Sequence, residues 1–367
     1  MLTELKVKVG PQFYLYSQGA IDEVPNLLAE YAAGHILVVH GGVSWEKAQP
    51  FMGFLEDQQY QVTYHRYTGE CSYVGAELIA EVVKATNSDF IIGVGGGKLA
   101  DLVGYAAHLV NLNFGVIPTL ASNCAPWTPL SVMYKENGQA EGKTEHFLRQ
   151  AAFMVSDPNL VIDAPVDYFI AGLADTLAKW YESDAILQQP HLKGSPFLAL
   201  ARETAVLCKE AIMTDSAKAI ADMKQGHISA EFNRLSEIIF AVAGMVGGLG
   251  DKYARNAAAH AIHDAISKYI PESHQFLHGE KVAYGIFYQL ALEGKWAVID
   301  ELRPFYQELS LPQSLHQMGI YPKDQTVIDA IITFIESKEK VHLIPIVITE
   351  ETLRQSLDQL EDYIGKG

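Results

Sequence analysis

The sequence predicts an α/β N-terminal domain with a mostly parallel sheet, followed by an all-α C-terminal domain. Strand-like and helix-like segments alternate through residues 1–162, which is typical of a sheet covered by helices. Strand signals then fade, and long amphipathic stretches continue through residues 163–367. In addition, a run of glycines directly follows one of the predicted strands, in Gly93-Val-Gly-Gly-Gly-Lys98.

The elements of the first domain are predicted from short apolar or β-branched runs and the turns that end them. We expect strands at residues 35–40, 60–67, 89–94 and 114–119, and a helix over 99–110. A further strand at 130–134 precedes the turn signal Asn137-Gly138, so the pair predicts a β-hairpin.

The second domain is predicted from helical periodicity. We expect helices at residues 197–213, 229–246, 256–269 and 282–299. The glycine-rich stretch Gly244–Gly250 is expected to form a flexible or close-packed interruption between two of them.

Composition narrows the class of protein. The chain has 367 residues, a net charge of −17 and a sequence pI near 5.1. Nucleic acid and anionic membranes are therefore not expected as partners, because their phosphates would be repelled. Three cysteines without a CxxC spacing indicate a reducing compartment, and no run approaches the ~20 apolar residues of a membrane span. We expect a cytoplasmic protein.

The glycine run is expected to bind phosphate. Backbone N–H groups reach an anion where no side chain intervenes, and the N-terminus of the next helix adds a positive field. Lys98 would add a point charge. The spacing is not that of a P-loop, since Leu99 follows the lysine, nor that of GxGxxG. An ordinary strand–helix turn is the alternative.

The loop after the fourth strand carries small polar side chains. Ligands of open α/β sheets bind beyond the C-terminal ends of the strands, so Thr119 and Ser122 are candidates to bind a ribose, a nicotinamide amide or a substrate. Cys124 has no adjoining histidine or lysine to activate it. We interpret it as a small residue lining a pocket rather than as a nucleophile.

One aspartate and two histidines, far apart in the chain, form a candidate metal site. Asp175, His260 and His278 would supply three ligands and leave a position for water or substrate. His263 and Asp264 share a helix face with His260, and His274 and His278 are spaced as an HxxxH pair. The alternative for each residue alone is a cap, a core group or a solvated surface group.

These motifs resemble the iron-containing alcohol dehydrogenase superfamily, in its glycerol-dehydrogenase-like branch, over essentially the whole chain. They are GGGKxxD (Gly95 to Asp101), the Pro118–Ser122 loop, the Asp175 segment, AHAIH (Ala259 to His263) and HGEK (His278 to Lys281). The resemblance implies the dehydroquinate synthase-like/iron-containing alcohol dehydrogenase fold. A Rossmann-like domain, 1–162, would bind the dinucleotide, and a helical domain, 163–367, would hold metal and substrate, with the site in the cleft between them.

The resemblance also implies site residues. Asp175, His260 and His278 would hold zinc or iron, and NAD or NADP would be the second cofactor. The implied cofactor-binding positions are Gly95, Gly96, Gly97, Lys98, Asp101, Thr119, Ser122, Thr128, Leu130 and Tyr134. A small-molecule substrate and a homo-oligomer are implied as partners.

Two departures from glycerol dehydrogenases are informative. Their loop carries Ser-Thr-Asp-Ala-Pro, whereas this chain has Cys124 where the aspartate would stand. Without this aspartate, a polyol substrate has no carboxylate to accept its hydroxyl hydrogen bond, and a substrate carboxylate meets no negative charge there. A 2-oxo or 2-hydroxy acid is therefore favoured, and the loop resembles that of bacterial hydroxycarboxylate dehydrogenases. Second, no acid follows the strand at 35–40, which ends in His40-Gly41-Gly42. NADP should therefore be tolerated or preferred.

The resulting hypothesis is hydride transfer between NAD(P)H and a small carbonyl or hydroxyl compound, with His263 as a candidate proton relay and Cys124 near the substrate. Three alternatives stay open. A glycerol dehydrogenase is weakened by Cys124. A dehydroquinate-synthase-like lyase would need more basic residues near the metal than Lys179 and Lys281. A non-catalytic dinucleotide-binding protein would lack the metal.

Overall fold

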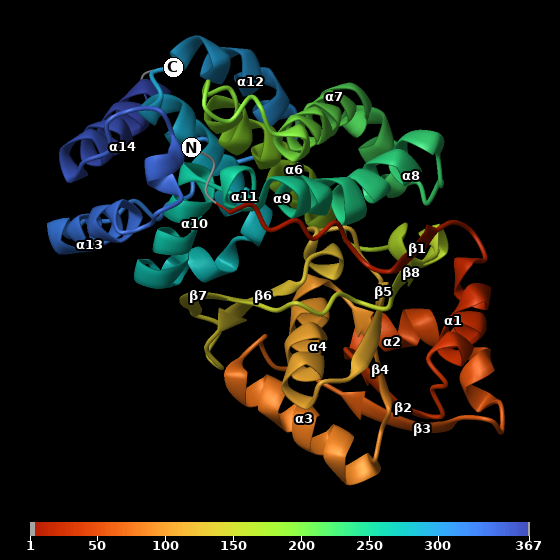
Figure 1. Cartoon of the computed structure of the whole chain (residues 1–367). Coiled ribbons are helices and arrows are strands. Elements are labelled where there is room, and N and C mark those ends of the chain that lie inside the picture. Colours follow the sequence, from red (N-terminus) through yellow and green to blue (C-terminus); the bar gives the residue numbers. More distant parts are fainter. Residues whose placement is uncertain (1–3, 366–367) are drawn as a thin grey trace. The chain divides into compact units, whose positions relative to one another are not determined.

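A computed structural model describes residues 4–365 (Figure 1). These residues divide into two compact units. Unit 1 comprises residues up to Val9, Ile170–Ser216 and Met245 onward, and unit 2 comprises Gly10–Phe169 and Ala217–Gly244. The domain boundary expected between residues 162 and 163, where strand signals give way to helical ones, stays a prediction.

Unit 2 contains a six-stranded parallel sheet in the order β1-β8-β5-β4-β2-β3. Its strands are β1 (Phe13–Tyr16), β2 (His35–His40), β3 (Gln61–Arg66), β4 (Phe90–Gly95), β5 (Asn113–Pro118) and β8 (Phe153–Ser156). The four predicted strands are confirmed within a residue or two. The flanking strands β1 and β8 were not predicted, since four residues are too few to show a period.

Helices cover both faces of this sheet. They are α1 (Val24–Glu30), α2 (Gly42–Ala48), α3 (Tyr73–Thr86), α4 (Gly97–Val110) and the single turn α5 (Pro158–Val161). Helices α3 and α4 pack against each other and against the central strands. Right-handed crossovers place these two helices on one face and α1 and α2 on the other. The core between them consists of fully buried aliphatic strand residues, such as Val38 and Ile92.

The predicted hairpin is confirmed. Strands β6 (Leu130–Tyr134) and β7 (Ala140–His146) pair antiparallel. In the turn between them, Gly138 has φ +83°, a left-handed conformation that glycine adopts without strain. The side-chain oxygen of Asn137 accepts a hydrogen bond from the N–H of Gln139 at 3.1 Å, which closes the turn.

All regular elements described after β8 are helices, as predicted. They are α6 (Val166–Leu187), α7 (Pro196–Lys224), α8 (Ala230–Glu237), α9 (Ala243–Gly250), α10 (Ala258–Tyr269), α11 (His278–Leu292), α12 (Trp296–Glu308), α13 (Gln325–Glu336) and α14 (Glu350–Gly365). In unit 1, α10 packs along α11, with α13 against α10 and α14 against α11.

Three helix predictions were wrong in extent. The helix expected at 197–213 continues to Lys224 as part of α7. The helix expected at 282–299 is two helices, because the chain turns at Gly294 with φ +71° between α11 and α12. The glycine-rich stretch 244–250 does not interrupt a helix; it forms α9, which follows α8 through the π-helical turn Ile238–Val242. The expectation of close packing holds, since a side chain at Gly248 would overlap the backbone carbonyl of Lys8.

One described helical stretch, Ala230–Tyr253, is long and apolar enough by composition to cross a membrane. No such run was expected from the sequence. However, 72% of its apolar window is buried inside the protein. A core helix of a globular protein has these same properties, so the stretch is explained by burial in the fold.

Candidate metal centre and dinucleotide turn

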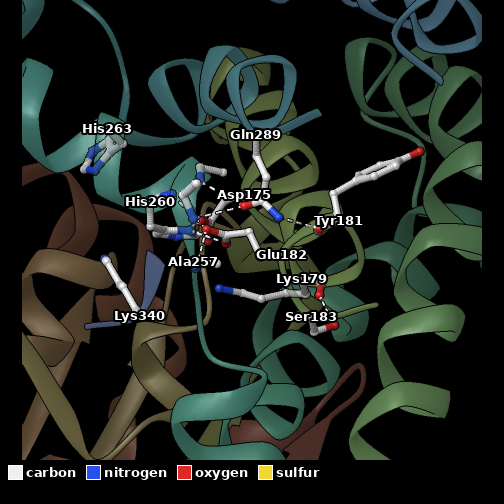
Figure 2. A network of polar contacts seen from close by, with 12 residues as sticks. Asp175, Lys179, Tyr181, Glu182, Ser183, Ala257, His260, His263, Gln289 and Lys340 are labelled. Atoms are coloured by element: carbon white, nitrogen blue, oxygen red, sulfur yellow. Dashed lines mark hydrogen bonds and ion pairs between the residues drawn. The ribbon is translucent and has the colours of Figure 1, made fainter. Parts of the chain in front are cut away.

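Three helices of unit 1 bring Asp175, His260 and His278 together. Asp175 lies in the middle of α6, His260 in the first turn of α10, and His278 is the first residue of α11. Asp175 and His260 are buried, and His278 is partly exposed. Figure 2 shows Asp175 and His260 meeting within a dense polar network.

The ligand atoms of these three residues converge. Nε2 of His260 lies 3.1 Å and Nε2 of His278 lies 3.2 Å from the same oxygen, Oδ1 of Asp175. One ligand atom from each residue lies within 4.8 Å of the others. Residues separated by 85 and 103 positions in the chain thus form one cluster.

Glu182 fixes the orientation of His260. Its Oε2 lies 2.6 Å from Nδ1 of His260, while its Oε1 accepts hydrogen bonds from the N–H groups of Ala257 and His260 at 2.6 and 2.8 Å. With Glu182 ionised, Nδ1 is the nitrogen that donates, so in the neutral ring Nε2, which faces Asp175, carries the lone pair. A carboxylate behind a histidine is the usual support of a metal-binding imidazole.

Gln289 completes the cap of α10. Its Oε1 accepts hydrogen bonds from the N–H groups of Ala258 and Ala259, at 3.0 and 3.2 Å, and its Nε2 donates to the carbonyl of Tyr181 at 2.8 Å. The first-turn N–H groups of α10 have no acceptors within the helix, so these buried side chains satisfy them. His260 is held by both its ring and its backbone (Figure 2).

Two glycines allow the helices to approach this closely. A Cβ at Gly279 would overlap the backbone carbonyl of Ala171 in α6, and one at Gly285 would overlap that of Ala259 in α10. The glycine of the HGEK motif therefore lets α11 begin directly against α6. This contact sets His278 next to Asp175.

Nearby positive charges and hydrogen bonds stabilise the ionised forms of Asp175 and Glu182. Burial works against ionisation, but the Lys179 charge and the hydrogen bonds with both histidines outweigh it and hold the pKa of Asp175 well below its usual range. The pKa of Glu182 is likewise lowered, since burial is outweighed mainly by His260. Burial also opposes protonation of His260, and Glu182 overcomes it, so that the pKa of His260 is raised.

A second polar chain leads away from His278. The rings of His263 and His278 are 4.2 Å apart between centroids. Nδ1 of His263 lies 3.0 Å from Oδ1 of Asp264, whose Oδ2 accepts from Lys340 at 3.1 Å. Burial, and then the charge of His278, lower the pKa of His263 well below its usual range. His263 is therefore neutral near pH 7.

The three converging residues fit a divalent metal ion. Two imidazole nitrogens and a carboxylate oxygen form a donor set typical of zinc or non-haem iron sites, with open positions left over. Two lone-pair-bearing atoms, such as Nε2 of His260 and Oδ1 of Asp175, repel each other at 3.1 Å unless a proton or a cation lies between them. The HxxxH pair has no such convergence, because His274 faces the carbonyl of Ser267 at 3.3 Å.

The predicted glycine turn lies in unit 2, between β4 and α4. Gly96 is the N-cap of α4, and a Cβ at Gly97 would overlap the side-chain amide of Asn123. The turn is thus closely packed on one side, where the amide of Asn123 would have to move to admit a side chain at Gly97. The side chain of Lys98 is exposed and pairs with Glu70, with Nζ 2.7 Å from Oε1. Lys98 would have to exchange this partner to contact a phosphate.

Topology places this turn at the expected ligand position of an α/β sheet. Strands β4 and β2 are neighbours in the sheet. From β4 the chain crosses to β5, which lies on the side away from β2, and from β2 it crosses to the edge strand β3, which lies on the side away from β4. Ligands bind at such a switch point, beyond the C-terminal ends of the strands. The region beyond the ends of β2 and β4 is therefore the candidate dinucleotide site.

The remaining predicted residues belong to the loop and hairpin that follow β5. Thr119 is buried and donates its N–H to the carbonyl of Gly95 at 3.2 Å. Asp101 is also buried and faces the hairpin, with Oδ2 accepting from the N–H of Val132 at 2.9 Å. The other predicted positions are partly exposed: Ser122, Cys124, Thr128, Leu130 and Tyr134.

Sequence reasoning did not identify Glu182, Gln289 or Lys340 as parts of the metal centre. Asp175, Lys179 and Glu182 are spaced i, i+4 and i+7, so they share one face of α6. That spacing was a signal that could have identified Glu182. No local pattern pointed to Gln289 or Lys340, which reach the site from other helices or loops.

Known proteins match this chain along its length. A family model described as iron-containing alcohol dehydrogenase matches residues 11–158. Hydroxycarboxylate dehydrogenase A of Escherichia coli (strain K12) is 32% identical over 98% of this chain and 98% of that protein. Glycerol dehydrogenase of Thermotoga maritima is 28% identical over 97% of this chain and 96% of that protein.

A solved structure shows the same fold. The crystal structure of a probable glycerol dehydrogenase from Sinorhizobium meliloti 1021 has a TM-score of 0.85 and 26% identity to this chain, and the match covers 98% of this chain and 99% of that one. The expected fold is thereby confirmed. With relatives named as dehydrogenases over nearly its whole length, this chain is an oxidoreductase that belongs to the iron-containing alcohol dehydrogenase family.

Proposed function

We propose that the protein is a metal-dependent, NAD(P)-dependent dehydrogenase that interconverts a small 2-hydroxycarboxylate and its 2-oxo acid. The observation that carries the proposal is the convergence of Asp175, His260 and His278 on one point. Zinc or iron bound there would act as a Lewis acid on a substrate oxygen. The nicotinamide carries the hydride.

The chain's own residues contribute positioning and proton transfer. Glu182 keeps Nε2 of His260 free to coordinate, and the glycines of α11 hold His278 beside Asp175. His263 would take a proton from the substrate hydroxyl during oxidation and return one during reduction, with Asp264 and Lys340 fixing its ring. Gly95, Gly96 and Gly97 would receive the dinucleotide pyrophosphate at the switch point.

Two observations support an acid substrate. The loop Ser122-Asn-Cys-Ala-Pro126 has no carboxylate, so a substrate carboxylate would meet no like charge from these residues. In addition, the E. coli relative, matched over nearly the full chain, is named a hydroxycarboxylate dehydrogenase. Glycerol is the second candidate, because other relatives of similar coverage are named glycerol dehydrogenases.

The substrate test is a panel of reactions followed by the absorbance of the reduced nicotinamide. Purified protein, stripped of metal and reloaded with zinc or ferrous iron, is offered 2-oxo acids, dihydroxyacetone and simple aldehydes with NADH and with NADPH. We expect turnover of 2-oxo acids that depends on added metal. Turnover of dihydroxyacetone alone would replace the acid by glycerol as the natural substrate.

The metal assignment is tested by paired histidine variants. His278→Ala should lose both bound metal and turnover, whereas His274→Ala, four residues earlier and outside the cluster, should keep both. Metal content is measured by elemental analysis of the purified proteins. Full activity in a metal-free His278→Ala protein would refute the proposed mechanism.

A further inference from the structure

Arg66, the last residue of β3, lies against Gly42 at the start of α2. A Cβ built on Gly42 would lie 2.7 Å from Nη2 and 3.1 Å from Cζ of Arg66. The guanidinium group therefore occupies space that a side chain at position 42 would need. Arg66 is exposed, and within residues 4–365 no hydrogen bond or ion pair joins its side chain to another residue.

The place of Arg66 in the sheet is the second observation. In the ladder, His40 at the end of β2 is opposite Arg66 of β3 on one side and Val94 of β4 on the other. Neighbouring strands are about 4.8 Å apart. A dinucleotide with its pyrophosphate on the turn after β4 would extend its adenosine ribose over the end of β2. The Arg66 side chain, from the next strand, lies at that end.

The residues after β2 lack the group that selects NAD. In NAD-binding sheets an aspartate or glutamate at this position accepts hydrogen bonds from the ribose hydroxyls, whereas an arginine there accommodates the 2′-phosphate of NADP. Here the strand ends in His40-Gly41-Gly42, and the nearby side chain is the guanidinium of Arg66. A guanidinium forms paired hydrogen bonds with a phosphate more readily than an ammonium group does.

We propose that Arg66 binds the 2′-phosphate of NADP(H) and that the enzyme prefers this cofactor to NAD(H). The inference rests on the proposed dinucleotide site at the switch point. It does not depend on the metal or on the identity of the substrate. A binding experiment can therefore test it without turnover.

The test is isothermal titration of the full-length protein with 2′,5′-ADP and with 5′-AMP, two probes that differ only in the 2′-phosphate. Wild-type protein should bind 2′,5′-ADP at least about tenfold more tightly than 5′-AMP, because a hydrogen bond between charged groups typically changes affinity by about this factor. Arg66→Ala should lose that difference and bind 5′-AMP unchanged. Lys47→Ala is the matched control, because it removes a positive charge from α2 that is already paired with Asp163.

A second variant tests the same contact from the other side. Gly42→Asp places a carboxylate next to Arg66, where the close atoms belong to its flexible guanidinium, so the fold should be kept. The new ion pair should weaken binding of 2′,5′-ADP about tenfold or more and should not weaken binding of 5′-AMP.

Three outcomes would overturn the inference. Equal binding of both probes by the wild type would show that the protein has no preference for the 2′-phosphate. An unchanged ratio of the two affinities in Arg66→Ala would show that Arg66 does not bind this phosphate. Failure of both probes to bind would refute the dinucleotide site itself. By contrast, normal probe binding in a protein that turns over no substrate would count only against the proposed reaction and would leave the Arg66 assignment supported.

Discussion

Nδ1 of His260 lies 2.6 Å from Oε2 of Glu182, and this contact joins the metal centre to the N-terminal cap of α10. A carboxylate in this position raises the basicity of the imidazole and fixes its tautomer. Glu182→Gln should therefore lower metal affinity about tenfold to a hundredfold. Competition with a chelating dye measures this affinity.

Glu361→Gln is the control for that change. Glu361 is also buried in unit 1, lies 2.7 Å from Nδ1 of His316, and accepts hydrogen bonds from the N–H groups of Leu315 and His316. It repeats the geometry of Glu182 away from Asp175 and its two histidines. Equal metal affinities in wild type and Glu182→Gln would show that Glu182 acts only as a helix cap.

The two glutamates illustrate what the sequence could and could not predict. Four of the six strands of the parallel sheet and the hairpin were predicted because apolar runs and Asn137-Gly138 are local signals. Asp175, His260 and His278 were proposed as a metal site from their residue types, and the resemblance of motifs strengthened that prediction, since nothing in their spacing brings them together. Glu182 was missed because a glutamate in an amphipathic helix usually faces solvent, and only the packing of α10 against α6 buries it.

Other misses have the same origin. The helix expected at 282–299 continues its apolar pattern across Gly294, and only the backbone conformation at this glycine reveals the break. Arg66 and Gly42 are adjacent because β2 and β3 pair in one register. The register in which two strands pair cannot be read from the sequence of either strand alone. The sequence therefore showed the missing acid after β2 but did not show that Arg66 lies beside it.

Gly279→Ala should destabilise the protein. The added methyl group would overlap the carbonyl of Ala171, so α11 would have to move away from α6. Backbone shifts of this kind cost about 1–3 kcal/mol, and here they would also separate His278 from Asp175. Thermal unfolding should show a lower Tm and metal analysis a lower content. Gly194→Ala, which meets no atom within 4 Å, should change neither, and a Tm of Gly279→Ala equal to that of wild type would contradict the close helix contact.

His263→Ala should keep the metal and slow the reaction. The ring of His263 is 4.2 Å from that of His278 between centroids but does not belong to the converging ligand set. Loss of a proton relay typically lowers kcat about a hundredfold. Elemental analysis should give unchanged metal content, and kcat is measured with saturating substrate. An unchanged kcat would assign His263 a packing role, whereas loss of metal would make it a ligand.

The buried carboxyl group of Asp101 should make the free energy of unfolding depend on pH. Burial raises the pKa of Asp101 to about 8, although the N–H of Val132 opposes the rise, and its Oδ1 has no hydrogen-bond partner among the described residues. The folded state thus binds a proton that the unfolded chain, in which the pKa has its ordinary value of 3.8, has released. This contribution is complete below the unfolded pKa and is lost as the pH rises toward about 8, by up to about 1.4 kcal/mol for each pH unit.

Asp101→Asn isolates that contribution, because the amide oxygen can still accept from Val132 but does not titrate. The free energy of unfolding of wild type, relative to the variant, should fall between about pH 4 and pH 8 and level off above it. Denaturant titrations at a series of pH values give this difference. A difference that stays constant over the range would mean that Asp101 is ionised in the folded protein, with a counter-charge supplied by a bound ligand or by a rearranged Lys98.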